Sequence, residues 1–281
     1  MNTSPRSIRK LLTGKPTLEG AGVHLTRIFA HNEVDAMDPF LLLDDFSSPN
    51  PEDHMQGFPW HPHRGIETVT YMLEGEVEHQ DSLGNKGIIG PGDVQWMTAG
   101  GGIIHQEMPL YSQTGIAGMQ LWVNLPRADK MTAPQYRGIT APEIPVVSED
   151  GVDVAVLSGV YKGTEGPCKG LFVDVRYLGV TFPGKGVFTY DAPEHFTTFV
   201  YVREGTVYVG DEPVREKTCA VLTNNASRIE VRTDGAPAHC IVVAGEPINE
   251  PVVWGGPIVM NTEEELQKAF EDIQNGTFVQ K

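Results

Sequence analysis

One nine-residue pattern occurs twice in this sequence of 281 residues. Residues 67–75 read ETVTYMLEG and residues 197–205 read TTFVYVREG, so that a Tyr, a Glu and a Gly align without a gap. Both copies are rich in β-branched and aromatic residues and end in a glycine, which is typical of a strand followed by a turn. The repeat predicts two similarly folded β domains in one chain.

The rest of the chain has the same β character. Short stretches rich in Val, Ile, Thr and aromatic residues recur between Gly, Pro, Asp and Asn turns, and the chain contains 31 glycines and 21 prolines. A segment rich in Pro, Arg and Lys, from Pro126 to Pro145, separates the two copies. We therefore predict an all-β fold with a first domain over residues 1–132 and a second over residues 133–281.

One helix is predicted at the end of the chain, over Thr262 to Gln274. It starts with Thr262 and Glu265, a pair that forms a capping box, and apolar residues follow at helical spacing. Gly276 is placed to end the helix. We expect this helix to pack against the second domain and to have no chemical role.

Charge and composition limit the binding partners and the cellular location that we expect. With a net charge of −16, the surface repels phosphate backbones, which argues against direct nucleic-acid binding. There is no run of 18 apolar residues and no apolar segment near the N-terminus, so we predict neither a membrane span nor a signal peptide. Three cysteines without C-x-x-C spacing suit a reducing compartment. We predict a cytoplasmic location, or a nuclear one in a eukaryote.

Two pairs of side chains have the spacing expected of metal ligands. His61 and His63 are two residues apart at the start of a predicted strand, and His105 and Glu107 repeat that spacing after a turn of three glycines. Alternate residues of a strand point to the same side, so each pair can reach a common ion. Three imidazoles and a carboxylate suit Fe(II), Mn, Ni, Cu or Zn. An octahedral ion would keep two positions open for substrate or dioxygen, which favours catalysis.

A later predicted strand carries Gln120 and Trp122 two residues apart. Their side chains share one face of that strand. They could line a substrate pocket if that face looks into the domain, although ordinary packing inside a barrel is the more common explanation of such a pair.

Three long strings resemble the pirin family of the cupin superfamily. They are HPHRGIETVTYMLEGEVEHQD, PGDVQWMTAGGGIIHQEMP and AGEPINEPVVWGGPIVMNT, and the resemblance extends from about residue 20 to the final helix. It implies two tandem cupin domains, which are jelly-roll-like β-barrels. It also implies one mononuclear iron, Fe(II), in the N-terminal barrel, held by three histidines and a glutamate that correspond here to His61, His63, His105 and Glu107.

The resemblance also decides between two carboxylates. General cupins often take their carboxylate ligand from the first motif, where Glu67 has the same parity as the two histidines. Pirins take it from the second motif, which is Glu107 here. Glu67 is then a partner of the ligands or a surface acid. In the second copy, Asp191 and Pro193 stand at the positions of His61 and His63, so we expect that domain to bind no metal.

Two functions are implied by the resemblance. Some pirins oxidise flavonols such as quercetin with dioxygen, and Glu107 would then take the proton of the substrate hydroxyl. Other pirins act as redox-sensing iron proteins that regulate a protein partner, as a transcription cofactor does. We favour the dioxygenase, because open coordination positions are the feature that the ligand pattern itself indicates.

Overall fold

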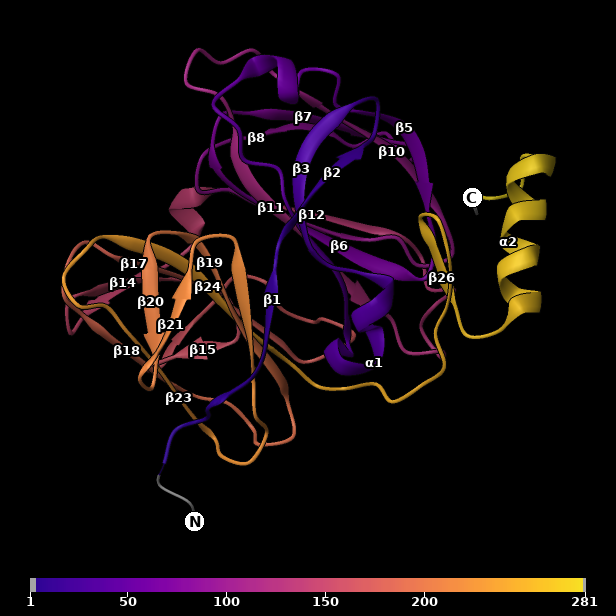
Figure 1. The fold of residues 1–281 in the computed structure, drawn as a ribbon. Coiled ribbons are helices and arrows are strands. Elements are labelled where there is room, and N and C mark those ends of the chain that lie inside the picture. Colours follow the sequence, from indigo (N-terminus) through magenta and orange to yellow (C-terminus); the bar gives the residue numbers. More distant parts are fainter. Residues whose placement is uncertain (1–3, 280–281) are drawn as a thin grey trace. The chain divides into compact units, whose positions relative to one another are not determined.

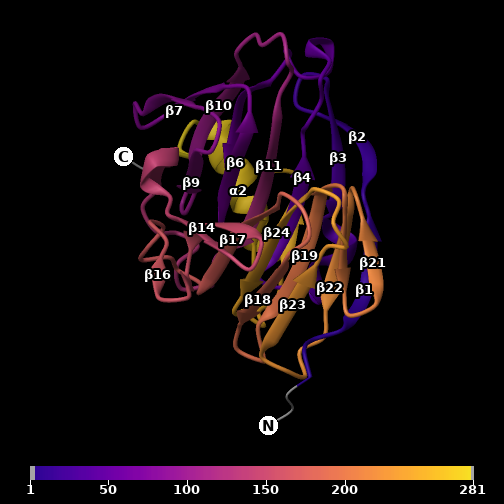
Figure 2. The same ribbon diagram turned by 90° about the vertical axis from the view of Figure 1, so that its left-hand side faces the viewer.

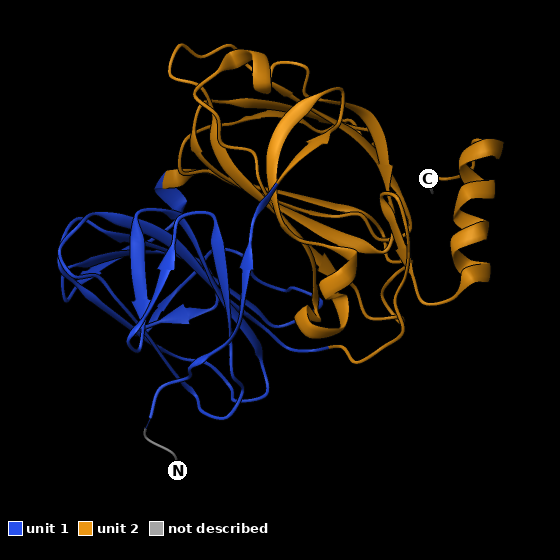
Figure 3. Cartoon of the chain, in the orientation of Figure 1, with its two compact units in different colours: residues 1–15, 142–247 blue, residues 16–141, 248–281 orange. Residues whose placement is uncertain are grey.

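The computed structural model describes residues 4–279 and consists mainly of antiparallel strands (Figure 1). The chain forms two compact units, unit 1 (residues 1–15 and 142–247) and unit 2 (residues 16–141 and 248–281), which are coloured separately in Figure 3. Each unit contains one seven-stranded and one four-stranded sheet. The predicted all-β fold with two similar domains is confirmed.

The sheets of unit 2 carry the residues that the sequence singled out. The larger sheet has the order β12 (Gln135–Ile139), β9 (Val94–Thr98), β6 (Ile66–Glu74), β11 (Ala117–Asn124), β4 (Phe40–Asp45), β3 (Val23–Phe29) and β2 (Lys15–Glu19). The smaller sheet has the order β5 (Phe58–His63), β10 (Ile103–Pro109), β7 (Val77–Asp81) and β8 (Lys86–Ile89). A short helix, α1 (Val34–Met37), connects β3 to β4.

The sheets of unit 1 have a matching order, whose strands can be followed in Figure 2. The larger sheet runs β1 (Ile8–Thr13), β22 (Thr218–Leu222), β19 (Thr197–Glu204), β24 (Ala238–Gly245), β17 (Val175–Phe182), β14 (Val152–Ser158) and β13 (Val146–Glu149). The smaller sheet runs β18 (Val187–Asp191), β23 (Arg228–Arg232), β20 (Thr206–Val209) and β21 (Glu212–Arg215). A two-stranded ribbon, β15 (Val160–Tyr161) and β16 (Thr164–Glu165), completes the unit.

The repeated sequence pattern forms the third strand of each larger sheet. β6 contains the first copy and β19 the second, and each ends at a glycine with a left-handed φ, 74° at Gly75 and 78° at Gly205. A Cβ atom at Gly75 would lie 2.8 Å from the carbonyl oxygen of Gly115, and one at Gly205 would lie 2.5 Å from that of Pro237. Both turns therefore need glycine for the same two reasons.

The predicted division at residue 132 does not coincide with the compact units. β1 pairs with β22 of unit 1, in the place that β12 takes beside β9 in unit 2. The C-terminal segment, residues 248–281, belongs to unit 2 and not to the second barrel. Composition marks where strands begin and end, but it carries no information about which sheet edge an isolated terminal strand will join.

The C-terminal segment forms a hairpin and the predicted helix. β25 (Val253–Gly255) pairs with β26 (Ile258–Met260), and α2 (Glu263–Asn275) follows. Thr262 and Glu265 form the capping box, and Gly276 ends the helix with a φ of 69°, as predicted. No helix within residues 4–279 combines the length and apolar character that crossing a membrane requires.

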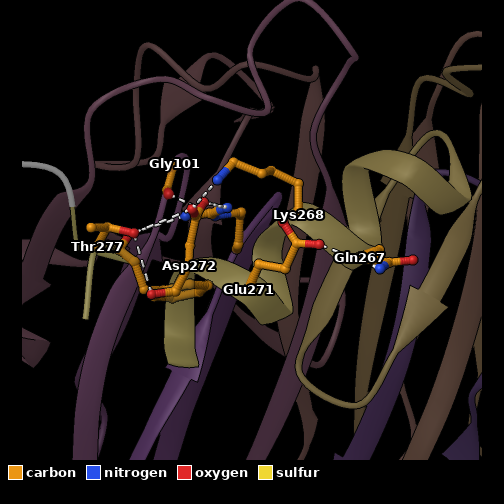
Figure 4. A network of polar contacts seen from close by, with 8 residues as sticks. Gly101, Gln267, Lys268, Glu271, Asp272 and Thr277 are labelled. Atoms are coloured by element: carbon orange, nitrogen blue, oxygen red, sulfur yellow. Dashed lines mark hydrogen bonds and ion pairs between the residues drawn. The ribbon is translucent and has the colours of Figure 1, made fainter. Parts of the chain in front are cut away.

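Arg64 holds the C-terminal segment onto unit 2. Its side chain is 1% exposed and donates hydrogen bonds to Asp272 Oδ2 at 2.8 Å and to the carbonyl oxygens of Gly101 and Phe278. Figure 4 shows Asp272 at the centre of these contacts, with Lys268 and Thr277 also bonded to its carboxylate. Hydrogen bonds from Lys268 and Arg64 lower the pKa of the Asp272 carboxyl to about 2, so it stays ionised near neutral pH.

Substitution of Arg64 by methionine is expected to destabilise unit 2. The change removes the buried guanidinium that bonds Asp272 and the carbonyl oxygens of Gly101 and Phe278. Lys268 stays beside the carboxylate, so we expect a loss of about 3 kcal/mol, the lower end of the range for breaking a buried ion pair. Urea unfolding of the two proteins measures the difference. Arg127→Met is the matched control, because Arg127 pairs with Glu265 of the same helix in an exposed position and should change stability by less than about 1 kcal/mol.

Unit 1 has one large apolar core between its two sheets. Its buried cluster joins both sheets, with Val200, Val242 and Leu178 from the larger and Phe188 and Val231 from the smaller. Apolar side chains from the two sheets interdigitate, which stabilises a two-sheet barrel.

His239 gives unit 1 a pH-dependent stability. Burial, followed by the nearby charge of Arg203, lowers the pKa of His239 from 6.5 to about 4. Because the folded pKa is the lower one, the neutral imidazole stabilises the fold above pH 6.5, and this contribution is lost as the pH falls from 6.5 to 4. The difference corresponds to about 3 kcal/mol. The free energy of unfolding of the wild type should therefore fall by about 3 kcal/mol relative to that of His239→Gln as the pH is lowered from 6.5 to 4. Parallel pH profiles of the two proteins would contradict the assignment.

Candidate metal centre and cavity

Two neighbouring strands of the smaller sheet bring three histidines together. β5 carries His61 and His63, β10 carries His105, and His61 lies directly opposite His105 in the antiparallel register. The ring centroids of His61 and His105 are 4.3 Å apart, and those of His63 and His105 are 5.0 Å apart. One nitrogen from each of the three rings lies within 4.8 Å of the others.

The hydrogen bonds of two of the rings fix where their lone pairs point. His61 Nδ1 lies 2.9 Å from the carbonyl oxygen of Pro59, and His63 Nδ1 lies 3.1 Å from that of Pro257. A carbonyl oxygen only accepts, so both Nδ1 atoms carry the proton. When both rings are neutral, the two Nε2 atoms, 3.1 Å apart, face each other with their lone pairs. Two facing lone pairs repel, and a cation between them turns this repulsion into attraction.

His105 completes the argument for a cation. It is fully buried, and neither of its ring nitrogens has a hydrogen-bond partner among the described residues. Burial and the neighbouring histidines lower the pKa of His63 and that of His105 well below the ordinary value. Both rings are therefore neutral, which is the form that binds a metal. The donor set fits a divalent ion of the first transition series.

Glu107 lies beside the three histidines without joining their cluster. It is 6% exposed and stands two residues after His105, on the same side of β10, which pairs regularly with β7 through both residues. Its Oε1 accepts a hydrogen bond from Thr70 at 3.3 Å, and its Oε2 accepts one from Gln120 at 3.1 Å. Its role as the fourth ligand stays a prediction.

Glu67 was expected to be a partner of the metal ligands or a surface acid, and the structure places it elsewhere. It is fully buried, so it is not a surface acid, and its carboxylate accepts from Trp96 Nε1 at 3.1 Å and from Thr98 Oγ1 at 2.6 Å. It alternates along β6 with Thr70, which bonds Glu107, so the two side chains point to opposite faces of the sheet. Burial raises the pKa of Glu67. The even spacing of His61, His63 and Glu67 suggested a shared face on one strand. In the structure, the histidines lie on β5 and Glu67 lies on β6, after a turn, so the spacing no longer sets the face.

A cavity of about 560 Å³ opens beside the histidines within unit 2. His61, His63 and Glu107 lie in its wall, together with Gln120 and Trp122, for which the sequence left pocket lining and barrel packing open. Most of the remaining wall is apolar or aromatic (Leu25, Leu42, Phe46, Phe58, Val77). This volume and lining are typical of sites for small organic ligands.

The C-terminal segment supplies wall residues that the sequence analysis did not assign. Trp254 lines the cavity, stacks on His31 with ring centroids 3.7 Å apart, and lies 5.7 Å from the Trp122 ring. Pro257 both lines the cavity and accepts the hydrogen bond from His63. These residues stand almost 200 positions after His63, so no spacing rule connects them; only their place in the third pirin-like string marked them.

Unit 1 offers no matching centre. The expected equivalents of the first histidine pair are Asp191, at the end of β18, and Pro193. Within the described residues, the three histidines are the only group of His, Cys, Asp or Glu side chains with metal-binding geometry.

Comparisons with known proteins agree with this architecture. The pirin family model matches residues 22–123, and the model of the pirin C-terminal cupin domain matches residues 177–279. A pirin-like protein of Caulobacter vibrioides is 46% identical over 97% of this chain and 99% of its own length, and pirin of Homo sapiens is 39% identical over 97% and 93%. The crystal structure of a quercetin 2,3-dioxygenase from Acinetobacter baumannii is 35% identical, covers 98% of this chain and 99% of its own, and superposes with a TM-score of 0.89. This chain belongs to the pirin family.

Proposed function

We propose that this protein is a flavonol dioxygenase of the quercetin 2,3-dioxygenase type, which binds its substrate in the cavity of unit 2 beside one divalent metal. The observation that carries the proposal is the convergence of three imidazoles beside a largely apolar cavity, with the Nε2 atoms of His61 and His63 only 3.1 Å apart. The likeness to the quercetin 2,3-dioxygenase of Acinetobacter baumannii supports the substrate class.

His61, His63 and His105 would hold the metal, with Glu107 as the fourth ligand. Iron, as Fe(II), is the ion that the family suggests. When bound, the metal supplies Lewis-acid and redox chemistry toward a phenolate and dioxygen. The carbonyl groups of Pro59 and Pro257 keep protons on the Nδ1 atoms, which leaves Nε2 of each ring available.

Glu107 is the group placed to take a proton from the substrate. It lies in the cavity wall, and the hydrogen bonds from Thr70 and Gln120 leave lone pairs on both carboxylate oxygens. A flavonol whose 3-hydroxyl reaches this carboxylate would lose its proton and become the electron-rich species that reacts with dioxygen. Glu107 therefore acts as general base in the proposal.

The aromatic wall binds the rings of the substrate and excludes water. Trp122 and Trp254 approach each other at the wall, and Phe58 and Phe46 contribute further aromatic surface. Planar aromatic ligands gain both buried apolar area and ring contacts in such a site. A dry cavity also protects the deprotonated substrate from competing protonation by solvent.

Oxygen consumption with two related compounds tests the proposal. Metal-loaded protein should consume dioxygen with quercetin but not with luteolin, which has the same rings and lacks the 3-hydroxyl. Chelation of the metal should abolish consumption with quercetin. Equal rates with both compounds, or a rate that survives chelation, would refute the assigned chemistry.

A further inference from the structure

A row of polar side chains crosses the inner face of the larger sheet in unit 2. Thr70 on β6 is opposite Gln120 on β11, Gln120 is opposite Asp44 on β4, and Asp44 is opposite Arg27 on β3. All four residues line the cavity. We call these four residues the polar strip. It begins at Glu107, which accepts from both Thr70 and Gln120.

At the end of the polar strip away from Glu107, the guanidinium group of Arg27 is fixed by hydrogen bonds to two carboxylates. Arg27 donates from Nε and Nη2 to the two carboxylate oxygens of Asp44, at 2.9 and 2.7 Å, and from Nη1 to Glu19 Oε1 at 2.7 Å. A guanidinium has five N–H groups, so two are not used in these three bonds. The bidentate geometry fixes the direction in which those groups point. This end of the cavity therefore presents oriented donors next to carboxylate acceptors.

The fold itself does not require polar residues in this row. In unit 1 the same row, taken from the equivalent strands β19, β24, β17 and β14, consists of Val200, Val242, Leu178 and Val156. All four are at most 1% exposed and form part of one apolar core. Asp44 is 6% exposed and Arg27 is half-buried. Holding this ion pair partly out of water costs desolvation, so its presence calls for a use.

We infer that Asp44 and Arg27, at the end of the polar strip away from Glu107, bind the phenolic hydroxyl groups on the substrate ring that is remote from the histidines. The inference rests on the proposed function and names the part of the cavity that selects among flavonols. Asp44 and Glu19 accept from phenolic O–H groups, and the unused N–H groups of Arg27 donate to phenolic oxygens. A carboxylated or phosphorylated ligand would be disfavoured, because the two acids outnumber the one base there.

The dimensions of the sheet agree with this placement. Neighbouring strands lie about 4.8 Å apart, so two strand spacings from Gln120 on β11 to Arg27 on β3 correspond to about 10 Å. A flavonol whose 3-hydroxyl is at Glu107 extends its pendant phenyl ring over a distance of this order. Its hydroxyl groups then fall near the held guanidinium, while the ring faces contact the apolar rows on either side of the polar strip.

Anaerobic binding of two flavonols tests the inference without turnover. Metal-loaded protein is titrated with quercetin, whose pendant ring carries two hydroxyl groups, and with galangin, whose pendant ring carries none. We expect the wild type to bind quercetin about tenfold more tightly, the effect of one or two hydrogen bonds to charged groups. The variant Arg27→Met with Asp44→Leu should bind both compounds with nearly the affinity of the wild type for galangin. Both residues are changed so that no carboxylate is left buried and unpaired.

A gentler variant and a matched control complete the design. Arg27→Lys keeps a cation beside Asp44 but removes the fork of donors, so the preference for quercetin should fall to about threefold in a protein that folds. Arg137→Met is the control, because Arg137 is a similarly half-buried arginine of the same sheet that does not line the cavity; it should keep the full preference. Metal content and melting temperature are measured for each protein.

Each outcome decides one of the two claims. Equal affinity of the wild type for the two flavonols, or an unchanged preference in both Arg27 variants, overturns the inference and leaves the proposed function standing. No binding of either flavonol to the metal-loaded wild type overturns the proposed function, and the inference falls with it.

Discussion

Replacing His105 by alanine is expected to abolish both metal binding at the centre and turnover of quercetin. Its two ring nitrogens are buried and have no hydrogen-bond partner within residues 4–279, so they are available to bind a metal. Loss of a ligand should reduce metal affinity by more than the roughly 10–100-fold that follows loss of a residue supporting a ligand. Isothermal titration with Fe(II) under anaerobic conditions measures the affinity, and oxygen uptake measures the turnover.

His54→Ala is the matched control for this substitution. His54 is also buried, with 1% exposure, but it is not part of the histidine cluster. Removing either ring costs packing, whereas only the His105 ring should matter to the metal. Equal losses of metal affinity in the two variants would mean that the effect is one of stability, and the assigned centre would be wrong.

Glu107→Gln is expected to lower kcat for quercetin by at least about 100-fold, the range typical of losing a general base. The amide has the shape of the carboxylate but cannot take a proton, and its NH2 group meets the donors of Thr70 and Gln120 instead of accepting from both. Rates compared at saturating metal separate this effect from a change in metal affinity. The loss should persist at every pH at which the protein is folded.

The second carboxylate of the sequence motif provides the control for Glu107. In Glu67→Gln, the side-chain amide can still form hydrogen bonds with Trp96 and Thr98 on the opposite face of the sheet. Metal content and kcat should therefore stay near those of the wild type. A Glu67 variant that loses metal while the Glu107 variant keeps both metal and turnover would reverse the assignment.

The sequence predicted most of the repeated architecture because the pattern within each copy involves only neighbouring residues. The aligned strands β6 and β19, their terminal glycines and the capping box at Thr262 all depend on residues a few positions apart. The pairing of β1 with β22 and the return of the C-terminal segment to unit 2 depend on contacts between residues far apart in sequence. No local pattern records those contacts, so the predicted domain boundaries differ from the bounds of the compact units.

The candidate site divides in the same way. His61, His63 and His105 were predicted from strand parity, and the structure brings them together. The carbonyl group of Pro257 is invisible to any motif, because every residue has a carbonyl and only the fold selects one. The polar strip was missed for a related reason: its four residues come from four strands and form a row only once the register of the sheet is known.

Oxygen uptake as a function of metal loading tests the central claim most directly. Metal-free protein is loaded stepwise with Fe(II) under anaerobic conditions, mixed with quercetin, and exposed to dioxygen while carbon monoxide is collected. The account predicts that the rate rises with bound metal, saturates at one ion per chain, and releases carbon monoxide as dioxygen is consumed. Binding of one ion per chain with no oxygen consumption on quercetin or any other flavonol would contradict it and would favour the alternative, an iron protein that regulates a partner.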